Sequence, residues 1–186
     1  MKPRALALLH YPVLDRRGDL VASAVTNLDL HDLARNAVTF GWDRFYVVTP
    51  IEEQRRLAER IRDHWCRGFG ADYNPHRKKA LELIEILPDL ETAIGDWEKH
   101  SGETVVPVLT GASVRGGISC EQCLEMNHRQ PLLLLFGTGW GLAPSLYQHG
   151  WPALEPIRGK GAYNHLPVRS AAAIIMDRLS GSARCP

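Results

Sequence analysis

The sequence predicts an α/β fold with a parallel sheet that has helices on both faces. Apolar stretches alternate with amphipathic stretches along the chain, as strands alternate with helices in this fold class. The most apolar stretch, residues 132–136, contains no polar residue, so both of its faces are expected to be covered. Gly137, Gly139 and Gly141 follow it directly, and ligands of such sheets bind beyond the carboxyl ends of the strands. The sequence therefore places a candidate pocket at this turn.

Length and composition narrow the possible classes of protein. A chain of 186 residues is expected to form one domain, residues 1–186. The net charge of +1 is no general nucleic-acid signature, so an RNA contact would need a local patch. No apolar run is long enough to span a membrane, and polar residues from His10 onward favour a first strand over a signal peptide. Four cysteines are too few for a disulfide scaffold, which favours a cytoplasmic protein.

Three strands and two helices are expected in the first half. Thr26 or Asn27 can cap the first helix, and Gly41 can end it. The core face of this helix is expected to be Leu30, Leu33, Ala34 and Ala37. The strands are expected at 5–9, 45–48 and 81–87, the helices at 27–40 and 51–65, and loops at 10–19 and 68–79.

The second half continues the same alternation. Pro88 or Asp89 is expected to start a helix. The helices are expected at 89–99, 119–128 and 169–179, with a short helical segment at 142–148. The strands are expected at 105–109, 132–136 and 153–157, with loops at 110–117 and 158–163.

Three loops of the second half follow three expected strands, at residues 110–113, 137–142 and 157–166. If they converge, their backbone groups and apolar walls suit an adenine ring and a ribose. Arg158 and Lys160 are the few cations expected there, which favours a cofactor without phosphates. The glycine spacing matches neither a dinucleotide fingerprint nor a P-loop. A glycine-rich turn without a ligand remains the alternative.

Polar side chains elsewhere have both functional and structural interpretations. His31, Asp32, Arg35 and Thr39 lie on one side of the first helix, where an Asp32–Arg35 surface pair is the simpler reading. The basic run at 76–79, together with Arg16, Arg17 and Arg115, could contact phosphates or form a solvated face. Cys120 and Cys123 have no second ligand pair, so they are read as ordinary helix cysteines and no metal site is expected.

Three segments, in order, resemble the motifs of the SPOUT superfamily of RNA methyltransferases, in its SpoU/TrmH-like branch. The first, TNLDLHDLARNAVTFGWDRFYVVTP, carries an asparagine before a helix, Arg-x-Ala on the helix, then Phe-Gly and a strand that ends at a proline. The second, LLLLFGTGWGL, is an apolar strand that leads into a glycine turn. The third, residues 157–179, is an isoleucine, a polar loop and an alanine-rich helix.

The resemblance implies a C-terminal trefoil knot, a homodimer, S-adenosylmethionine as cofactor, and an RNA substrate such as tRNA or rRNA. It implies Arg35 and Asn27 as catalytic residues, with Arg35 acting across the dimer interface in many members. The cofactor-binding residues that it implies are Leu109, Thr110, Gly111, Phe136, Gly137, Thr138, Gly139, Trp140, Gly141, Leu142, Ile157, Tyr163, Asn164, Leu166, Ser170 and Ala171.

The third motif departs from the family pattern, because Pro167 stands where SpoU members have asparagine. This leaves open whether a ribose 2′-oxygen or a base nitrogen is methylated. His165 is a candidate proton acceptor or a histidine that only packs, and Asp32 and Glu155 are candidate bases for a guanine nitrogen. A non-catalytic RNA-binding protein with the same knot and a nicotinamide-dependent oxidoreductase are the alternatives.

Overall fold

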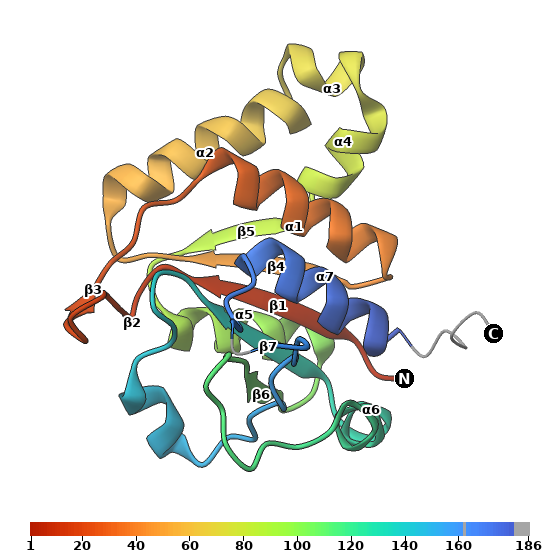
Figure 1. The fold of residues 1–186 in the computed structure, drawn as a ribbon. Coiled ribbons are helices and arrows are strands. Elements are labelled where there is room, and N and C mark those ends of the chain that lie inside the picture. Colours follow the sequence, from red (N-terminus) through yellow and green to blue (C-terminus); the bar gives the residue numbers. More distant parts are fainter. Residues whose placement is uncertain (162, 181–186) are drawn as a thin grey trace.

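Five parallel strands form the centre of the computed structural model, which describes residues 1–161 and 163–180 (Figure 1). The strand order is β5-β4-β1-β7-β6, and β1 pairs with β4 on one side and with β7 on the other. The predicted parallel sheet is confirmed. The strands are β1 (Arg4–Leu9), β4 (Arg44–Val48), β5 (Ile84–Leu87), β6 (Val106–Leu109) and β7 (Leu132–Gly137).

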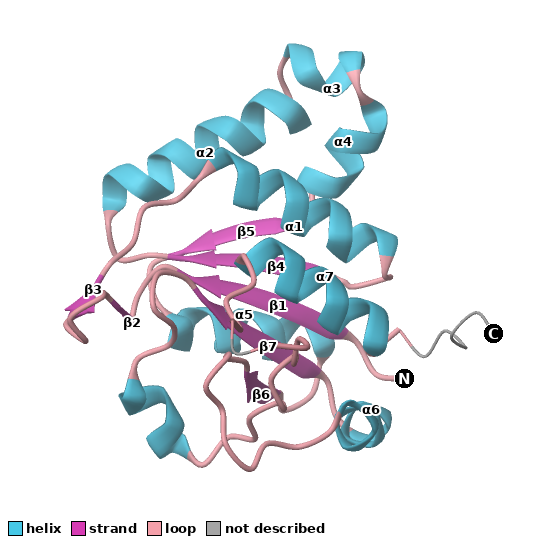
Figure 2. Cartoon of the chain, in the orientation of Figure 1, coloured by secondary structure: helices cyan, strands magenta, loops and turns pink. Residues whose placement is uncertain are grey.

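Helices cover both faces of this sheet, as Figure 2 shows. One face packs against α1 (Asn27–Thr39), α2 (Glu52–Cys66), α4 (Pro75–Leu81) and α7 (Val168–Arg178). The other face packs against α5 (Leu90–Ser101) and the 3₁₀ helix η1 (Pro144–His149). Alternate residues of β1 enter the two cores, Leu6 and Leu8 on one side and Ala5, Ala7 and Leu9 on the other. Covered faces explain why the central strands are apolar after their first residue.

Local capping fixes where several helices begin and end. The Thr26 hydroxyl accepts the Asp29 N–H at 3.2 Å and caps α1, and Gly41 follows that helix with φ +66°. Asp89 caps α5 by accepting the Thr92 N–H at 2.7 Å. Ser119 and Gln122 form a capping box that begins α6 (Cys120–Arg129). These starts agree with the sequence-based expectations.

Three expectations were wrong. Residues 68–79 do not form a loop, because α3 (Phe69–Tyr73) and α4 occupy this stretch, and the following strand begins only at Ile84. The cause is Asn74-Pro75: Asn74 caps α4 and Pro75 is its first residue, so a pair that usually breaks structure here begins a helix. The loop expected at 10–19 contains β2 (Val13–Leu14), which pairs with β3 (Leu20–Val21).

The third error is the strand expected at 153–157. This segment forms only two isolated bridges, Ala153 with Leu109 and Leu154 with Ile118. It meets β6 only at Leu109, the last residue of that strand, and then meets Ile118 in the loop that follows, so no ladder of consecutive pairs forms. The Leu154 N–H donates to the Leu109 carbonyl at 2.8 Å, and the Glu155 N–H donates to the Ile118 carbonyl at 2.9 Å.

Candidate cofactor cleft

A cavity of about 1340 Å³ lies at the carboxyl ends of β6 and β7, where the three predicted loops meet. Its wall includes most of the predicted cofactor-binding residues: Thr110, Gly111, Phe136, Gly137, Thr138, Gly139, Trp140, Gly141, Leu142, Ile157, Tyr163, Asn164, Leu166 and Ala171. Leu109 and Ser170 are not in the wall. Leu109 is fully buried and holds the 152–154 segment through its backbone, whereas Ser170 is exposed on α7.

The glycine turn after β7 is held from behind by the β2–β3 hairpin. The Trp140 N–H donates to the Leu14 carbonyl at 2.9 Å, and the Leu14 N–H donates to the Gly141 carbonyl at 3.0 Å. Gly139 has φ +58°, and a Cβ on it would lie 2.8 Å from the Leu14 carbonyl oxygen. Only glycine fits this position without strain.

A chain of three polar side chains joins the end of β1 to this turn. The His10 Nδ1 lies 2.8 Å from the Ser23 Oγ, which lies 2.5 Å from the Thr138 Oγ1. The Thr138 hydroxyl donates to the Leu9 carbonyl at 3.1 Å. Ser23 and Thr138 line the cavity, whereas His10 is fully buried behind them. Burial lowers the pKa of His10 to about 4, so its ring is neutral at physiological pH.

Sequence reasoning missed Ser23 and His10. The only available signal was that His10 directly follows a buried strand. Ser23 is separated in sequence from both of its hydrogen-bond partners, His10 and Thr138.

The charged residues in the wall differ from those expected. Arg115, Asp29 and Glu155 line the cavity. Arg158 borders a smaller cavity of about 190 Å³ instead, and Lys160 borders neither cavity. His165 lines both cavities and is exposed, with its ring 5.4 Å from that of Tyr163. The wall therefore carries more negative than positive charge.

The predicted catalytic residues on α1 lie outside the cavity wall. Asn27 is exposed at the first position of α1, while its neighbours Thr26 and Asp29 line the cavity. Arg35 is exposed, and in the described part of the chain its side chain forms no ion pair. The suggested Asp32–Arg35 pair is wrong, because Asp32 pairs with Arg169 of α7 at 2.7 Å.

The remaining motifs lie away from the cleft. Cys123 is buried on α6, and burial raises the pKa of its thiol to about 12, so it is an unreactive core residue. Cys120 precedes it on the same helix, and Cys185 lies outside the described residues. Among the described residues, no three His, Cys, Asp or Glu side chains are grouped to hold a metal ion. Over the same residues, no helix is long and apolar enough to cross a bilayer.

Comparison with known proteins finds two relatives that are much longer than this chain and one of similar length. A tRNA (guanine-N(1)-)-methyltransferase of Oleidesulfovibrio alaskensis is 45% identical over 95% of this chain, and one of Nitratidesulfovibrio vulgaris is 43% identical over 94%. The chain spans only 42% and 41% of these two proteins. A protein of Aquifex aeolicus without an assigned function is 36% identical over 97% of this chain and 89% of its own length.

Solved structures share the fold at low sequence identity. A putative methylase family protein from Neisseria gonorrhoeae matches with a TM-score of 0.63 at 14% identity, over 100% of this chain and 84% of that one. The SpoU methyltransferase AviRb from Streptomyces viridochromogenes, solved with AdoMet, matches with a TM-score of 0.56 at 14% identity, over 96% and 57%. The architecture is therefore that of SpoU-type methyltransferases.

One family model covers nearly all of the chain. It matches residues 4–181 and describes SAM-dependent RNA methyltransferases. The match includes every strand of the sheet and all three loops that form the cleft. The nicotinamide alternative has no support from these comparisons. The chain belongs to the family of SAM-dependent RNA methyltransferases.

Proposed function

We propose that this chain transfers a methyl group from S-adenosylmethionine to a nucleotide of structured RNA, with tRNA favoured over rRNA. The observation that supports this most is the single cleft formed by three separate loops, in a chain that the family model matches from residue 4 to 181. The relatives named for guanine-N(1) methylation of tRNA are more than twice as long as this chain, so their names favour tRNA without fixing the methylated atom.

The cleft fits S-adenosylmethionine better than a phosphorylated cofactor. Arg115 is the one arginine or lysine among the described wall residues, which is too little for a pyrophosphate or triphosphate. Glu155 offers negative charge to a ligand whose sulfonium and ammonium groups are both positive, whereas the charge of Asp29 is partly offset by Arg169 at 3.3 Å. Phe136, Leu142 and other apolar side chains suit the adenine ring. The wall of the 137–142 turn, with Ser23 and Thr138, would hold this cofactor.

The cofactor supplies a methyl group on a positively charged sulfur. The chain's own residues must align the nucleophile and remove its proton, and alignment supplies much of the rate. Arg35 would orient a phosphate or stabilise a developing alkoxide, because its charge is permanent and its donors are planar. Asn27 would hold the nucleotide at the start of α1. His165 lies in the wall of the cleft and would accept the proton.

Arg35 and Asn27 lie outside the cavity of their own chain, so we propose a homodimer in which they serve the partner's cleft. The one chain described supplies no second copy, and the support for the dimer is this placement together with the family resemblance. We place the protein in the cytoplasm, where its RNA substrates are.

We also propose that residues 1–186 form one domain and that its C-terminal part is threaded as a trefoil knot. The support is the position of residues 152–155, which hydrogen-bond to Leu109 on one side and to Ile118 on the other. The chain would pass through the loop between these residues before it reaches α7. An experimental structure in which this segment runs outside the loop would contradict the knot.

Calorimetry with S-adenosylmethionine and its demethylated product tests the cofactor, and methyl incorporation into bulk tRNA tests the reaction. Arg35→Ala is expected to abolish incorporation while cofactor affinity stays within about twofold, because Arg35 does not line the cavity. Equal loss of both would remove Arg35 from the catalytic role. Failure of wild-type protein to bind either ligand would count against the function itself.

A further inference from the structure

Three helices between β4 and β5 form a unit that we call the helical arm (residues 52–81; Figure 1): α2 and α4 pack over the sheet face, and α3 lies beyond it. A crossover between parallel strands needs only one helix, and α2 already supplies it. The short helix α3 lies at the far end of the arm, and it buries only Gly70 and Ala71. The end of the arm therefore adds little to the core.

Two aromatic rings stand exposed at this end. Phe69 and Tyr73 lie one helical turn apart, and they are 76% and 73% exposed. Their ring centroids are 5.8 Å apart and the planes are inclined by 21°, so the rings stack. Among the described residues, the only other aromatic side chains more than half exposed are Trp140 and Tyr163, and both border the cofactor cleft. This exposed pair is therefore a candidate contact surface.

Packing inside the arm fixes the direction of these rings. Trp65 of α2 lies between α3 and α4: a Cβ on Gly70 would be 2.5 Å from its ring, and the Arg77 guanidinium lies 4.4 Å from its centroid. The rings of His31 and His64 meet the Trp65 ring edge-on at 5.5 and 5.0 Å. Gly70 thus allows α3 to rest directly on Trp65, which holds the Phe69–Tyr73 pair outward.

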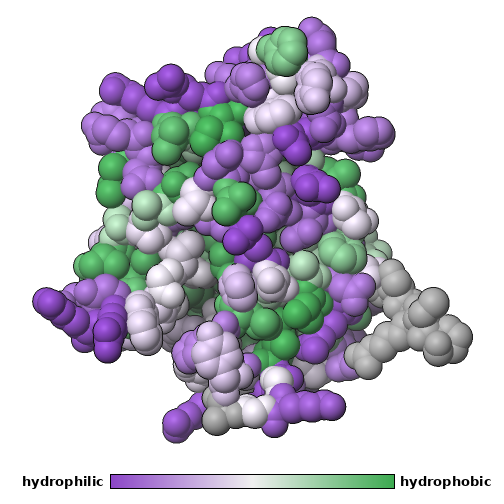
Figure 3. Space-filling view, turned by 45° about the horizontal axis from the view of Figure 1, so that its top comes forward, coloured by the Kyte–Doolittle hydropathy of each residue, from purple (hydrophilic) through white to green (hydrophobic). Residues whose placement is uncertain are grey.

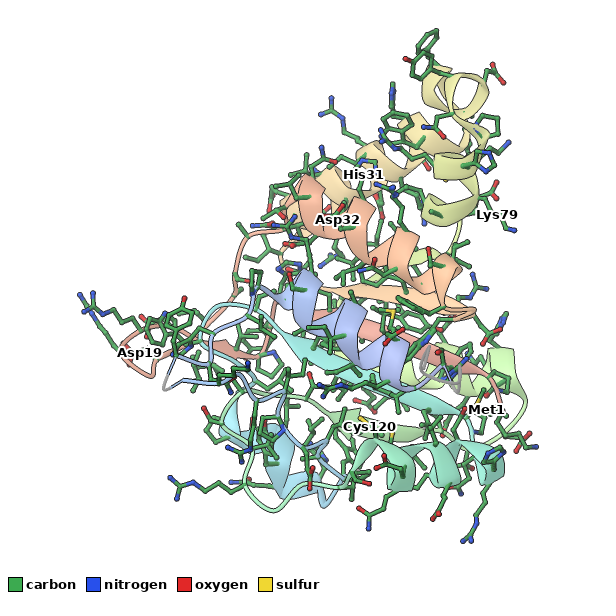
Figure 4. The ribbon with its side chains drawn as sticks, turned by 45° about the vertical axis from the view of Figure 1, so that its right-hand side comes forward. Met1, Asp19, His31, Asp32, Lys79 and Cys120 are labelled. Carbon is green, nitrogen blue, oxygen red and sulfur yellow. The ribbon has the colours of Figure 1, made fainter. Side chains whose placement is uncertain are left out.

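The same region carries a concentrated positive charge. Residues 64–81 contain four Lys and Arg residues against one acidic residue, Asp72, whereas the whole chain has a net charge of only +1. Over the described part of the chain, Arg77, Lys78 and Lys79 form no ion pair. Lys79 extends outward from α4 (Figure 4), and hydrophilic residues predominate over the arm in the space-filling view (Figure 3).

This charge continues from the arm onto α1. α4 packs along α1, and Arg77 and Arg35 both act on His31, whose pKa is lowered by burial and then by these two cations. Arg77 therefore lies on the same side of the molecule as Arg35, the residue proposed to contact the substrate.

We propose that the helical arm binds unpaired nucleotides of the RNA substrate, with bases stacked on Phe69 and Tyr73 and phosphates held by Arg77, Lys78 and Lys79. The inference rests on the proposed function, since it assigns a surface to that RNA. Aromatic faces with nearby cations are the combination that binds single-stranded RNA without strict sequence preference. A second copy of the chain fits less well, because a two-fold contact here would bring like charges together.

Fluorescence anisotropy with a fluorescein-labelled 12-nucleotide oligouridine tests the stacking surface. Phe69→Ala and Tyr73→Ala are each expected to raise Kd about thirtyfold, the middle of the range that one stacked base contributes. Phe69→Tyr and Tyr73→Phe keep the rings and should bind as wild type does. Leu57→Ala, which removes another exposed apolar side chain from α2, is the matched control and should change nothing.

Salt dependence separates base contacts from phosphate contacts. A Lys78→Ala, Lys79→Ala double variant loses two phosphate contacts. The slope of its log association constant against log salt concentration should therefore be less negative than that of the wild type by about 1.4. The alanine variants of Phe69 and Tyr73 should keep the wild-type slope. Calorimetry with S-adenosylmethionine and a thermal melt accompany each variant to confirm that the cleft and the fold are intact.

Two results would overturn the inference and leave the methyltransferase proposal standing. One is unchanged oligouridine binding in the Phe69→Ala, Tyr73→Ala double variant. The other is a wild-type protein that binds S-adenosylmethionine and methylates tRNA but binds vesicles of phosphatidylserine through this surface in place of oligouridine. Failure of the wild type to bind S-adenosylmethionine would instead remove the proposed function, and the inference with it.

Discussion

The hydrogen bonds around buried His10 show which of its two ring nitrogens carries the proton. The single hydroxyl proton of Thr138 goes to the Leu9 carbonyl, so the Ser23 hydroxyl must donate to Thr138. Ser23 then accepts from His10, which places the ring proton on Nδ1 and leaves Nε2 as a buried acceptor without a partner among the described residues. The neutral ring thereby sets the orientation of two hydroxyls at the cofactor cleft.

This arrangement predicts a pH dependence of stability. The pKa of His10 falls from 6.5 to about 4 on folding, so between these values the unfolded chain binds the extra proton. Stability is therefore lost as pH falls below about 6.5, by roughly 3 kcal/mol once pH 4 is reached. His10→Asn keeps an N–H donor but does not titrate, so urea unfolding at pH 7.5 and pH 5 should show a smaller difference for the variant. The same pH difference in both proteins would contradict the assignment.

Gly139 gives a prediction at the glycine turn. Gly139→Ala should lower the free energy of unfolding by about 2 kcal/mol or more, because its φ of +58° is unfavourable for alanine and the added Cβ meets the Leu14 carbonyl. Gly95→Ala is the control: Gly95 lies inside α5 with open space around it, and there alanine should add about 0.5–1 kcal/mol. Urea denaturation measures both. Equal behaviour of the two variants would show that the turn is not constrained.

Site residues could be predicted from the sequence where they are neighbours along it. The stretch 137–142 is visible as a glycine turn after an apolar strand, and the structure places all of it in the wall. Ser23 and Asp29 were missed because they reach the wall only when β1 and α1 pack beside β7. Arg115 was seen only as a possible phosphate contact: the loop at 110–113 was expected to reach the pocket, but Arg115, two residues beyond it, was not included.

At the scale of elements, one arginine of α7 links this last helix to α1, the first helix of the chain. Arg169 near the start of α7 contacts Asp29 at 3.3 Å and Asp32 at 2.7 Å, both on the first turns of α1. Asp29 also lines the cavity, so this contact helps to define the mouth of the cleft. The sequence predicted both helices. Their relative placement follows from core packing, so it could not be predicted from the sequence.

Breaking this contact should weaken the docking of α7. Arg169→Gln is expected to lower the free energy of unfolding by roughly 1 kcal/mol at low salt, because the pairs are only partly buried. Arg169→Lys should recover less than half of this, since an ammonium cannot hold two carboxylates in the planar geometry of arginine. Urea unfolding at 0.05 M and 1 M NaCl measures the effect. An effect that persists undiminished at 1 M NaCl would indicate lost packing rather than lost charge.

The fold of the whole molecule was easier to predict than its helical arm. Five mostly apolar strands that alternate with amphipathic stretches indicate the sheet from the sequence pattern. The arm has short helices, many charges and an Asn-Pro pair, which together imitate a loop. Its helices depend on the packing of Trp65 against Arg77 and Gly70, which are separated in sequence.

The proposed dimer makes a prediction for the whole assembly. Ala171→Trp adds bulk to the cavity wall and should abolish cofactor binding, whereas Arg35→Ala should not. If Arg35 serves the partner's cleft, a refolded equal mixture of the two inactive variants should regain about a quarter of wild-type methyl incorporation, since half of the dimers have one complete site. A mixture that stays inactive while sedimentation shows mixed dimers would place Arg35 and its cleft in the same chain.

The order of the strands has a consequence for synthesis on the ribosome. β1 leaves the exit tunnel early and can pair with β4, but its other neighbour, β7, is not complete until residue 137. During that interval β1, which is apolar from Ala5 to Leu9, keeps one edge unpaired, and such edges are prone to bind other chains. This edge of β1 is therefore open to other chains until residue 137 has been translated.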